Sequence, residues 1–303
     1  MKMKNNTTMF STEDKASVKA WNDYIQKENL EYTKDIYDKV DLLTQLVDSL
    51  HTEDIKMEEW LTWSEPMIYK LVFHSSTLLQ MFYGTRIYIK QKAVTIFDEP
   101  SVIMLMRVVL ENYLTFFYLF CDNISVEEKK FRISVWKYCG LKQRTEFNIS
   151  TIEAKEKQAQ ELLLVEEIKK EIGSSIFYLK LKKDEQSLLL KGKKPRLFYS
   201  WEKLIRISGL RRDLFKNLYG YKSSYAHSEF LSVLQIKSNH YGIKKEDKEH
   251  YVLFMIHMLI CKSILDLTKL FASIKKNFEV LDKSIQAEIY FLNRFLTDSE
   301  LDK

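Results

Sequence analysis

Three side chains that can handle a proton or a phosphate stand four residues apart in the segment LYGYKSSYAHSEF: Tyr219, Ser223 and His227. Four residues advance a helix by slightly more than one turn, so we expect these polar groups on one helix face. An unperturbed histidine titrates near neutral pH, which makes His227 the best candidate for a general acid or base. Ser223 and Tyr219 would then orient it or a bound phosphate. The alternative interpretation is structural, with the histidine donating to a backbone carbonyl at the end of a helix.

A basic region leads up to this segment. Between Lys180 and Lys222 the chain has thirteen Lys or Arg and four acids, a net charge of +9 in a chain whose total is +5. Positive charge at this density favours a phosphate-bearing ligand such as RNA or a nucleotide. The candidate phosphate contacts are Lys193, Lys194, Arg196, Arg211, Arg212 and Lys222.

A second pair of polar residues lies in the apolar segment from Pro100 to Cys121, where Arg107 and Glu111 have i,i+4 spacing. A buried ion pair needs further polar partners, and the Tyr219–Ser223–His227 face is a concentrated supply of them. We therefore expect Arg107 or Glu111 to approach Ser223 or His227 to about 4 Å, directly or through one water. The alternative is an ion pair that only ties its helix to neighbouring helices.

Several other chemistries lack their signature residues. The patterns GxSxG, HExxH, GxxxxGK[ST] and GxGxxG are absent, and no Cys/His cluster has metal-ligand spacing, so we expect neither a metal nor a cofactor. Cys121, Cys139 and Cys261 lie in apolar surroundings without CxxC spacing, which indicates reduced thiols in a cytoplasmic protein. The Pro100–Cys121 segment is long enough to span a bilayer, but its two central charges favour a buried core helix over a membrane span.

The elements that position these residues should be long helices, because the chain has only seven Gly and three Pro. We predict an all-α fold, a multi-helix bundle, with an N-terminal helical arm in 1–60, a core domain in 61–275 and a C-terminal helix packed on the core in 276–303. Helices are expected over 10–50, 57–89, 100–121, 125–147, 151–172, 201–207, 210–227 and 280–296. A further long helix is expected after the polar connection SNHYGIKKED and should end at about Ile274. A short extended piece is expected at 93–97, and a basic loop or two short elements at 173–200.

The R-x-x-x-E helix of Arg107 and Glu111, followed by ISGL and the Y-x-x-x-S-x-x-x-H segment, resembles an uncharacterised bacterial all-helical family over residues 70–265. In outline it is also similar to the HEPN domains, helical bundles of toxins and antiviral effectors. Many HEPN domains are dimeric, metal-independent ribonucleases with an R-x(4–6)-H motif, in which arginine holds phosphate and histidine transfers a proton. The resemblance implies that His227 is this histidine, although Lys222 stands where an arginine is expected.

The resemblance therefore implies a HEPN-like core in a protein of bacterial defence or toxin systems. Such a protein would bind RNA or a nucleotide, as a homodimer or with a protein partner. It would act either as a metal-independent endoribonuclease or as a nucleotide-binding effector. The missing arginine keeps a second reading open, a non-catalytic helical interaction or scaffold protein in which the Tyr219–Ser223–His227 face is a structural polar lock.

Overall fold

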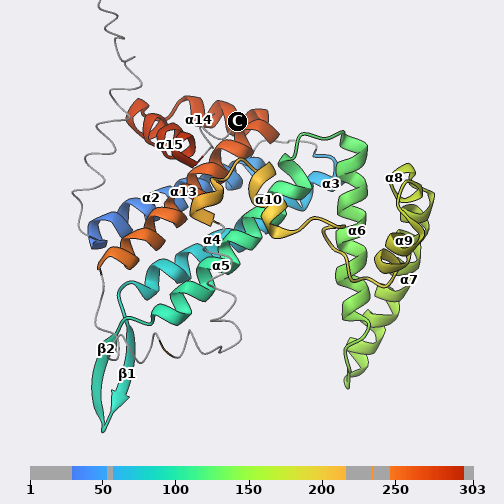
Figure 1. Ribbon diagram of the computed structural model, residues 1–303, viewed down its shortest axis with the longest axis horizontal. Coiled ribbons are helices and arrows are strands. Elements are labelled where there is room, and N and C mark those ends of the chain that lie inside the picture. Colours follow the sequence, from blue (N-terminus) through green and yellow to red (C-terminus); the bar gives the residue numbers. More distant parts are fainter. Residues whose placement is uncertain (1–28, 53–56, 216–233, 235–245, 297–303) are drawn as a thin grey trace, which may run out of the picture. The chain divides into compact units, whose positions relative to one another are not determined.

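The computed structural model describes residues 29–52, 57–215, 234 and 246–296. Its helices and strands follow one another along the chain as shown in Figure 1. In order they are α2 (Asn29–Thr52), α3 (Glu59–Thr62), α4 (Ser64–Met81), β1 (Thr85–Ile89), β2 (Lys92–Ile96), α5 (Glu99–Phe116), the π-helix η1 (Phe117–Cys121), α6 (Val126–Arg144), α7 (Ile152–Ser174), α8 (Ile176–Leu179), α9 (Lys183–Leu190), α10 (Trp201–Ile207), α13 (Glu246–Leu270), α14 (Ala272–Glu279) and α15 (Lys283–Leu296). The predicted all-α, multi-helix fold is confirmed.

One β-hairpin interrupts the helices. Strand β2 confirms the extended piece predicted at 93–97, but the prediction that the preceding helix runs to Ile89 was wrong, because α4 ends at Met81 and 85–89 is strand β1. The residues of β1, TRIYI, are mostly β-branched or aromatic and favour a strand. At Gly84, φ is 93° and a Cβ would lie 2.3 Å from Thr95 Cγ2, so only glycine fits where the helix gives way to the hairpin.

Two predicted helix starts, near residues 100 and 125, are confirmed by caps. Asp98 Oδ1 accepts a hydrogen bond from the Ser101 N–H (3.2 Å) at the start of α5. Ser125 Oγ accepts one from the Glu128 N–H (3.2 Å) at the start of α6. These caps satisfy N–H groups that have no partner within their own helix. Of the two alternatives predicted for 173–200, a basic loop or two short elements, the structure has the second, as α8 and α9.

The chain divides into two compact units, of which unit 1 comprises Met1–Lys56, Glu65–Tyr113 and Gly209–Lys303. Within this unit α13 packs against α2, α14 and α15, and α14 also packs against α2. Helix α13 is buried at every position from Val252 to Leu267. Helix α2 of the expected arm therefore packs directly on the most buried helix of the unit.

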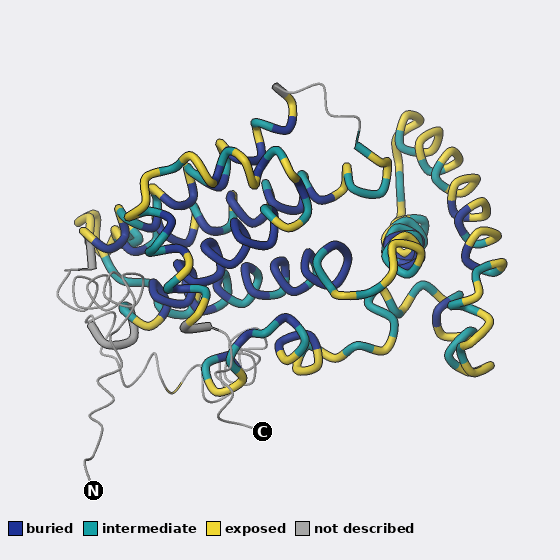
Figure 2. Tube along the Cα trace, turned by 90° about the horizontal axis from the view of Figure 1, so that it is seen from above, coloured by how far each residue is buried: buried dark blue, intermediate teal, exposed yellow. Residues whose placement is uncertain are grey.

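Unit 2 comprises Met57–Ser64 and Leu114–Ser208. Helix α6 packs along α7, and α8 packs against α7. Its apolar core is formed mainly by α6, α7 and α9, with Phe131, Val135, Tyr138, Cys139, Val165, Ile168, Ile172 and Leu189 buried together. Helix α7 is exposed along most of its length (Figure 2).

Two helical stretches among the described residues, Glu99–Cys121 and His250–Leu270, are long and apolar enough to cross a membrane by length and composition. In the structure, 67% and 83% of the respective apolar windows are buried inside the protein. The core helices of proteins without a membrane span pass the same test, and this burial supports that interpretation for both.

Candidate nucleic-acid interface

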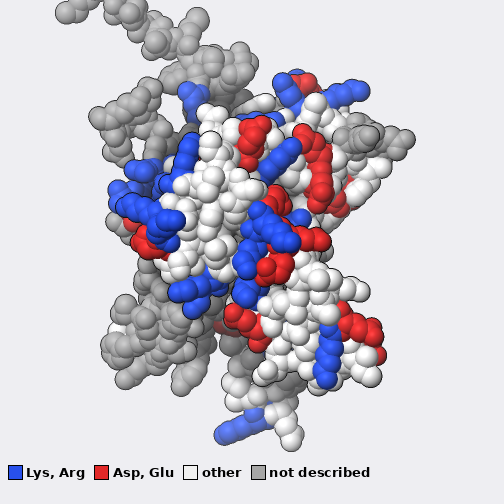
Figure 3. Space-filling model, turned by 90° about the vertical axis from the view of Figure 1, so that its right-hand side faces the viewer, with Lys and Arg blue, Asp and Glu red and all other residues white. Residues whose placement is uncertain are grey.

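The positive charge of unit 2 is concentrated in one segment. Nine Lys or Arg and three acids occur between Lys180 and Arg206, whereas residues 114–179 contain ten of each sign. On the face drawn in Figure 3 basic and acidic side chains are interspersed, with several groups of basic ones among them. Of the predicted phosphate contacts, Lys193 is exposed and Lys194 and Arg196 are half-buried. The segment therefore carries a net charge of +6, which would attract an anionic ligand.

Aromatic rings alternate with the basic residues around the connection from α9 to α10. Three cations lie over ring faces, at the given distances to the ring centroids: Lys194 over Phe198 (5.6 Å), Arg196 over Trp201 (3.4 Å) and Lys203 over Tyr199 (3.6 Å). Attraction between a cation and a ring face holds such pairs in place. Bases of single-stranded nucleic acids stack on rings and on guanidinium planes, and lysines pair with phosphates. The segment presents both kinds of group together.

A fully buried arginine of α6 anchors this segment. The Arg132 Nη1 donates to Asp122 Oδ2 (2.7 Å) and to the Tyr118 carbonyl (3.0 Å). Its Nη2 donates to Glu128 Oε1 (2.9 Å) and to the Tyr199 hydroxyl (3.2 Å). The guanidinium also lies over the rings of Tyr118 and Tyr199, 4.3 and 5.0 Å from their centroids. Tyr199 thus contacts the buried Arg132 as well as Lys203, which ties the basic segment to α6.

Arg132 was not among the site residues predicted from the sequence. The local signal was present, because Glu128 and Arg132 have i,i+4 spacing. Its other partners are not signalled by any local spacing. Asp122 directly follows the π-helix η1, and Tyr199 lies 67 residues further along the chain than Arg132. Burial raises the pKa of Tyr118, so this phenol remains neutral at ordinary pH.

The predicted ion pair of α5 is present in unit 1. Arg107 Nε donates to Glu111 Oε1 at 2.8 Å, and the two side chains are 19% and 28% exposed. The pair is therefore half-buried at the edge of the core. Tyr219, Ser223 and His227, with Lys222, lie outside the described residues, and so does the predicted approach of Arg107 or Glu111 to them.

Two predicted phosphate contacts belong to unit 1. Arg211 pairs with Asp213 through two hydrogen bonds, Nε to Oδ1 at 3.1 Å and Nη2 to Oδ2 at 2.5 Å. Hydrogen bonding from Arg211 lowers the pKa of the Asp213 carboxyl, so this carboxylate competes with any phosphate for the guanidinium. Arg212 is exposed.

A buried polar cluster in unit 1 contains His257, which is 1% exposed. Tyr32 Oη lies 2.8 Å from its Nδ1, while its Nε2 lies 3.5 Å from Glu288 Oε1, an ion-pair distance when the ring is protonated. The other Glu288 oxygen pairs with Lys39 Nζ at 2.7 Å. His250, one of the two histidines seven residues apart on α13, stacks on the ring of Tyr32 at 5.5 Å between centroids. The cluster thus joins α2, α13 and α15 within unit 1.

A second buried cluster in unit 1 surrounds Asp266, which is 1% exposed. Lys262 Nζ donates to both of its carboxylate oxygens (2.7 and 2.8 Å), and the Tyr113 hydroxyl donates to Oδ2 (2.9 Å). Lys269 donates to Oδ1 from the surface (3.1 Å). Three donors thus satisfy the buried carboxylate, and Tyr113 joins the end of α5 to α13 within unit 1.

The three cysteines are free thiols, as predicted. Burial raises the pKa of Cys139 to about 11 and that of Cys261 further, so both are neutral near pH 7 and poor nucleophiles. Groups of three or more His, Cys, Asp or Glu side chains that could hold a metal ion are absent from the described residues.

In comparisons with known proteins, no family model matches the chain, and neither does any curated protein or solved structure.

Proposed function

We propose that this protein binds single-stranded RNA through the basic segment Lys180–Arg206 of unit 2. The observation that carries the proposal is the combination of a net charge of +6 with three cation–ring pairs in one stretch of chain. Pairing of phosphates with lysines and arginines supplies most of the affinity for nucleic acids, and ring stacking adds about 1–3 kcal/mol per base. The anchoring of Tyr199 by Arg132 supports the proposal, since it gives the segment a defined geometry.

The second part of the proposal is cleavage. It rests on the resemblance to HEPN domains and on the Tyr219, Ser223 and His227 spacing. In this scheme His227 moves the proton of a ribose 2′-hydroxyl, while Lys222 holds the phosphate as a point charge. The protein is then a metal-independent endoribonuclease of a cytoplasmic bacterial defence or toxin system.

Binding is tested by the fluorescence anisotropy of a labelled single-stranded RNA, titrated with the full chain at several salt concentrations. The variant carries Lys182→Gln, Lys203→Gln and Arg206→Gln, all at exposed positions. The matched control carries Lys155→Gln, Lys157→Gln and Lys170→Gln on α7, which removes the same charge from exposed positions of the same unit. We expect the first variant alone to reduce the slope of log K against log salt, by about 0.7 for each phosphate that the variant no longer neutralises. Equal effects of the two triple variants would refute the interface.

Cleavage is tested by incubating the full chain with RNA in EDTA. We expect cutting by the wild type and none by His227→Ala. If the wild type leaves the RNA intact, the proposed ribonuclease activity is refuted. The proposed RNA binding is unaffected by this result, because the anisotropy assay tests it separately.

A non-catalytic scaffold is the second candidate function. It is favoured by the polar clusters around Arg132 and Asp266, in which buried charges are paired with opposite charges of the protein itself. If the His227 face is another such lock, His227→Ala should lower stability by about 1–3 kcal/mol and leave RNA binding unchanged. Thermal unfolding and the cleavage assay on this one variant separate the two functions.

A further inference from the structure

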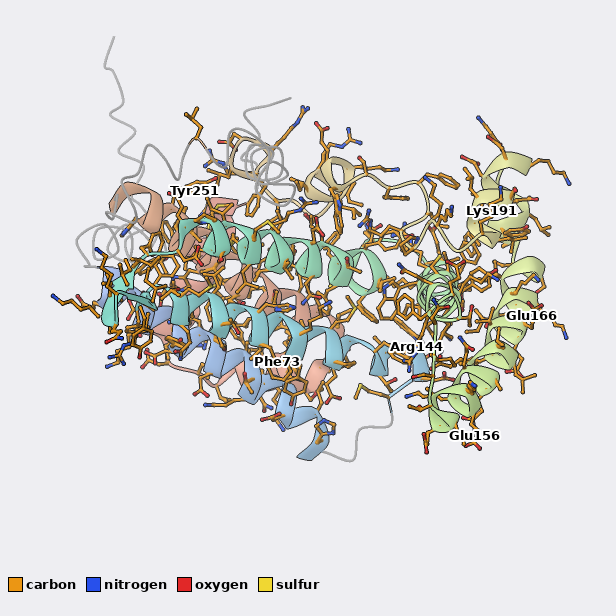
Figure 4. All side chains as sticks on the ribbon, turned by 90° about the horizontal axis from the view of Figure 1, so that it is seen from below. Phe73, Arg144, Glu156, Glu166, Lys191 and Tyr251 are labelled. Atoms are coloured by element: carbon orange, nitrogen blue, oxygen red, sulfur yellow. The ribbon has the colours of Figure 1, made fainter. Side chains whose placement is uncertain are left out.

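Unit 2 contains a pocket of about 550 Å³ between the second half of α6 and the turn that follows α9. Its volume lies in the range of roughly 300–1,000 Å³ that is typical of small-molecule sites. The side chains and backbone that matter for its chemistry are those of Trp136, Gly140, Gln143, Glu146, Lys191 and Lys193. Figure 4 labels Lys191 where α9 ends.

A glycine on the helical wall leaves this pocket open. Gly140 lies inside α6, where glycine is less stable than alanine. Its φ is not positive, and a Cβ at this position would meet no atom within 4 Å. Neither the backbone conformation nor packing therefore requires glycine here. Gly140 is exposed and is one of the residues that line the pocket, so a larger side chain here would occupy open space at the pocket wall.

The opposite wall is fixed against α6. Gly192 has φ of 71° and its N–H donates to the Leu189 carbonyl at 2.8 Å, which closes the end of α9 with a left-handed residue. A Cβ on Gly192 would lie 2.8 Å from Lys142 Cγ. The Tyr138 hydroxyl of α6 donates to the Leu190 carbonyl at 2.6 Å. The turn that carries the two pocket lysines is thus held in place, and the pocket is preformed.

The lining combines a ring, two cations and a carboxylate. Trp136 is held by an edge-on contact with Trp63, with ring centroids 6.1 Å apart and planes at 75°. Lys191 and Lys193 are exposed, and within the part of the chain that the structure describes neither forms an ion pair with an acid. Glu146 adds a carboxylate, which accepts hydrogen bonds and donates none when ionised.

We propose that this pocket binds a guanine nucleotide. The base stacks on Trp136, and its N1–H and N2–H donate to the Glu146 carboxylate, while the phosphate pairs with Lys191 and Lys193. Guanine fits because its pairing edge offers two adjacent N–H donors. Adenine and cytosine offer one donor beside an acceptor, and uracil offers one donor between two acceptors, so each would place a lone pair against the carboxylate.

The same chemistry is present in a free guanosine monophosphate and in a guanosine residue of RNA. Binding of a guanosine residue of RNA rests on the proposed RNA-binding function, whereas binding of the free nucleotide does not depend on it. The triple variant at Lys182, Lys203 and Arg206 changes no residue of the pocket lining. It should therefore bind guanosine monophosphate as the wild type does, whatever happens to its RNA affinity.

The test is isothermal titration calorimetry of guanosine monophosphate with the full chain and two matched variants. Gly140→Leu places a large side chain at the pocket wall, while Gly173→Leu makes the same change inside α7, where a Cβ also meets nothing within 4 Å and which does not line this pocket. Leucine is a better helix former than glycine, so both variants should melt no lower than the wild type. We expect at least a tenfold loss of affinity for Gly140→Leu and no change for Gly173→Leu. Unchanged binding by Gly140→Leu would overturn the proposal.

Base specificity is tested with the four ribonucleoside monophosphates. The wild type should prefer the guanine nucleotide at least fivefold, and Glu146→Gln should abolish this preference. Equal binding of all four by the wild type would overturn the role given to Glu146. An RNA containing guanosine should compete with the free nucleotide if RNA is the source, whereas an RNA of the same length without guanosine should not.

Discussion

Replacing Arg132 by methionine should destabilise unit 2 by about 3 kcal/mol. Methionine keeps an unbranched apolar stem of similar length but loses two charge-assisted hydrogen bonds, each of which contributes roughly 1.5–3 kcal/mol. It also loses the stacking of a desolvated guanidinium on two rings, worth about 2 kcal/mol. Two effects offset the loss: burial of the arginine no longer costs desolvation, and Asp122 and Glu128, whose side chains are 15% and 29% exposed, regain contact with water.

The assay is urea unfolding followed by tryptophan fluorescence. Four of the five tryptophans belong to unit 2, so the signal reports mainly on that unit. Arg144→Met is the matched control, because Arg144 lies on the same helix and pairs with Glu161 at 3.1 Å, but its side chain is 51% exposed. Such an exposed pair contributes at most about 1 kcal/mol. Our reasoning is that the unit is stabilised by several partners converging on a buried cation, and not by the presence of an ion pair as such. Equal unfolding midpoints for the two variants would refute it.

Three further measurements test other features of the fold. Because burial raises the pKa of Cys139 to about 11, the folded thiol keeps its proton above pH 9 while the unfolded one loses it; the free energy of unfolding of the wild type should fall by about 1–2 kcal/mol more than that of Cys139→Ala between pH 8 and 10. Asp266→Asn should cost roughly 3–5 kcal/mol in urea unfolding, because it leaves the buried Lys262 ammonium without a carboxylate. Gly140→Ala should stabilise unit 2 by about 0.5–1 kcal/mol, whereas Gly192→Ala should destabilise it by more than that, since φ is positive only at the second glycine.

The helices were predictable because their signals are local. Scarce Gly and Pro force long elements, and the caps of Asp98 and Ser125 depend on side chains next to the helix start. The hairpin was harder to predict because Lys90 and Gln91 occupy its turn with φ of 47° and 66°. Such positions usually carry Asn or Gly, so the turn gave no recognisable sequence signal, and the helical pattern was extended to Ile89.

The site was predictable only where its partners are close in sequence. The Arg107–Glu111 pair follows from i,i+4 spacing and is present at 2.8 Å. The hydrogen bond from Tyr113 to Asp266 joins residues 153 positions apart, and its existence depends on how α5 and α13 pack within unit 1. The pocket of unit 2 could not be predicted from the sequence for the same reason, because Gly140 and Lys193 become neighbours only once α9 is fixed against α6.

Arg107 and Arg132 show why an apolar helix is a poor guide to a buried charge. Both arginines pair with a glutamate four residues away. Arg107 lies in the more apolar segment, which is why the sequence predicted it, and not Arg132, as the arginine of a buried ion pair. Yet the Arg107 side chain is 19% exposed and that of Arg132 is 0% exposed. A charge becomes buried where several partners converge on it, because only then is its desolvation compensated. For Arg132 these partners are a second carboxylate, a backbone carbonyl and two tyrosine rings, and one of those rings belongs to the segment that we propose binds RNA.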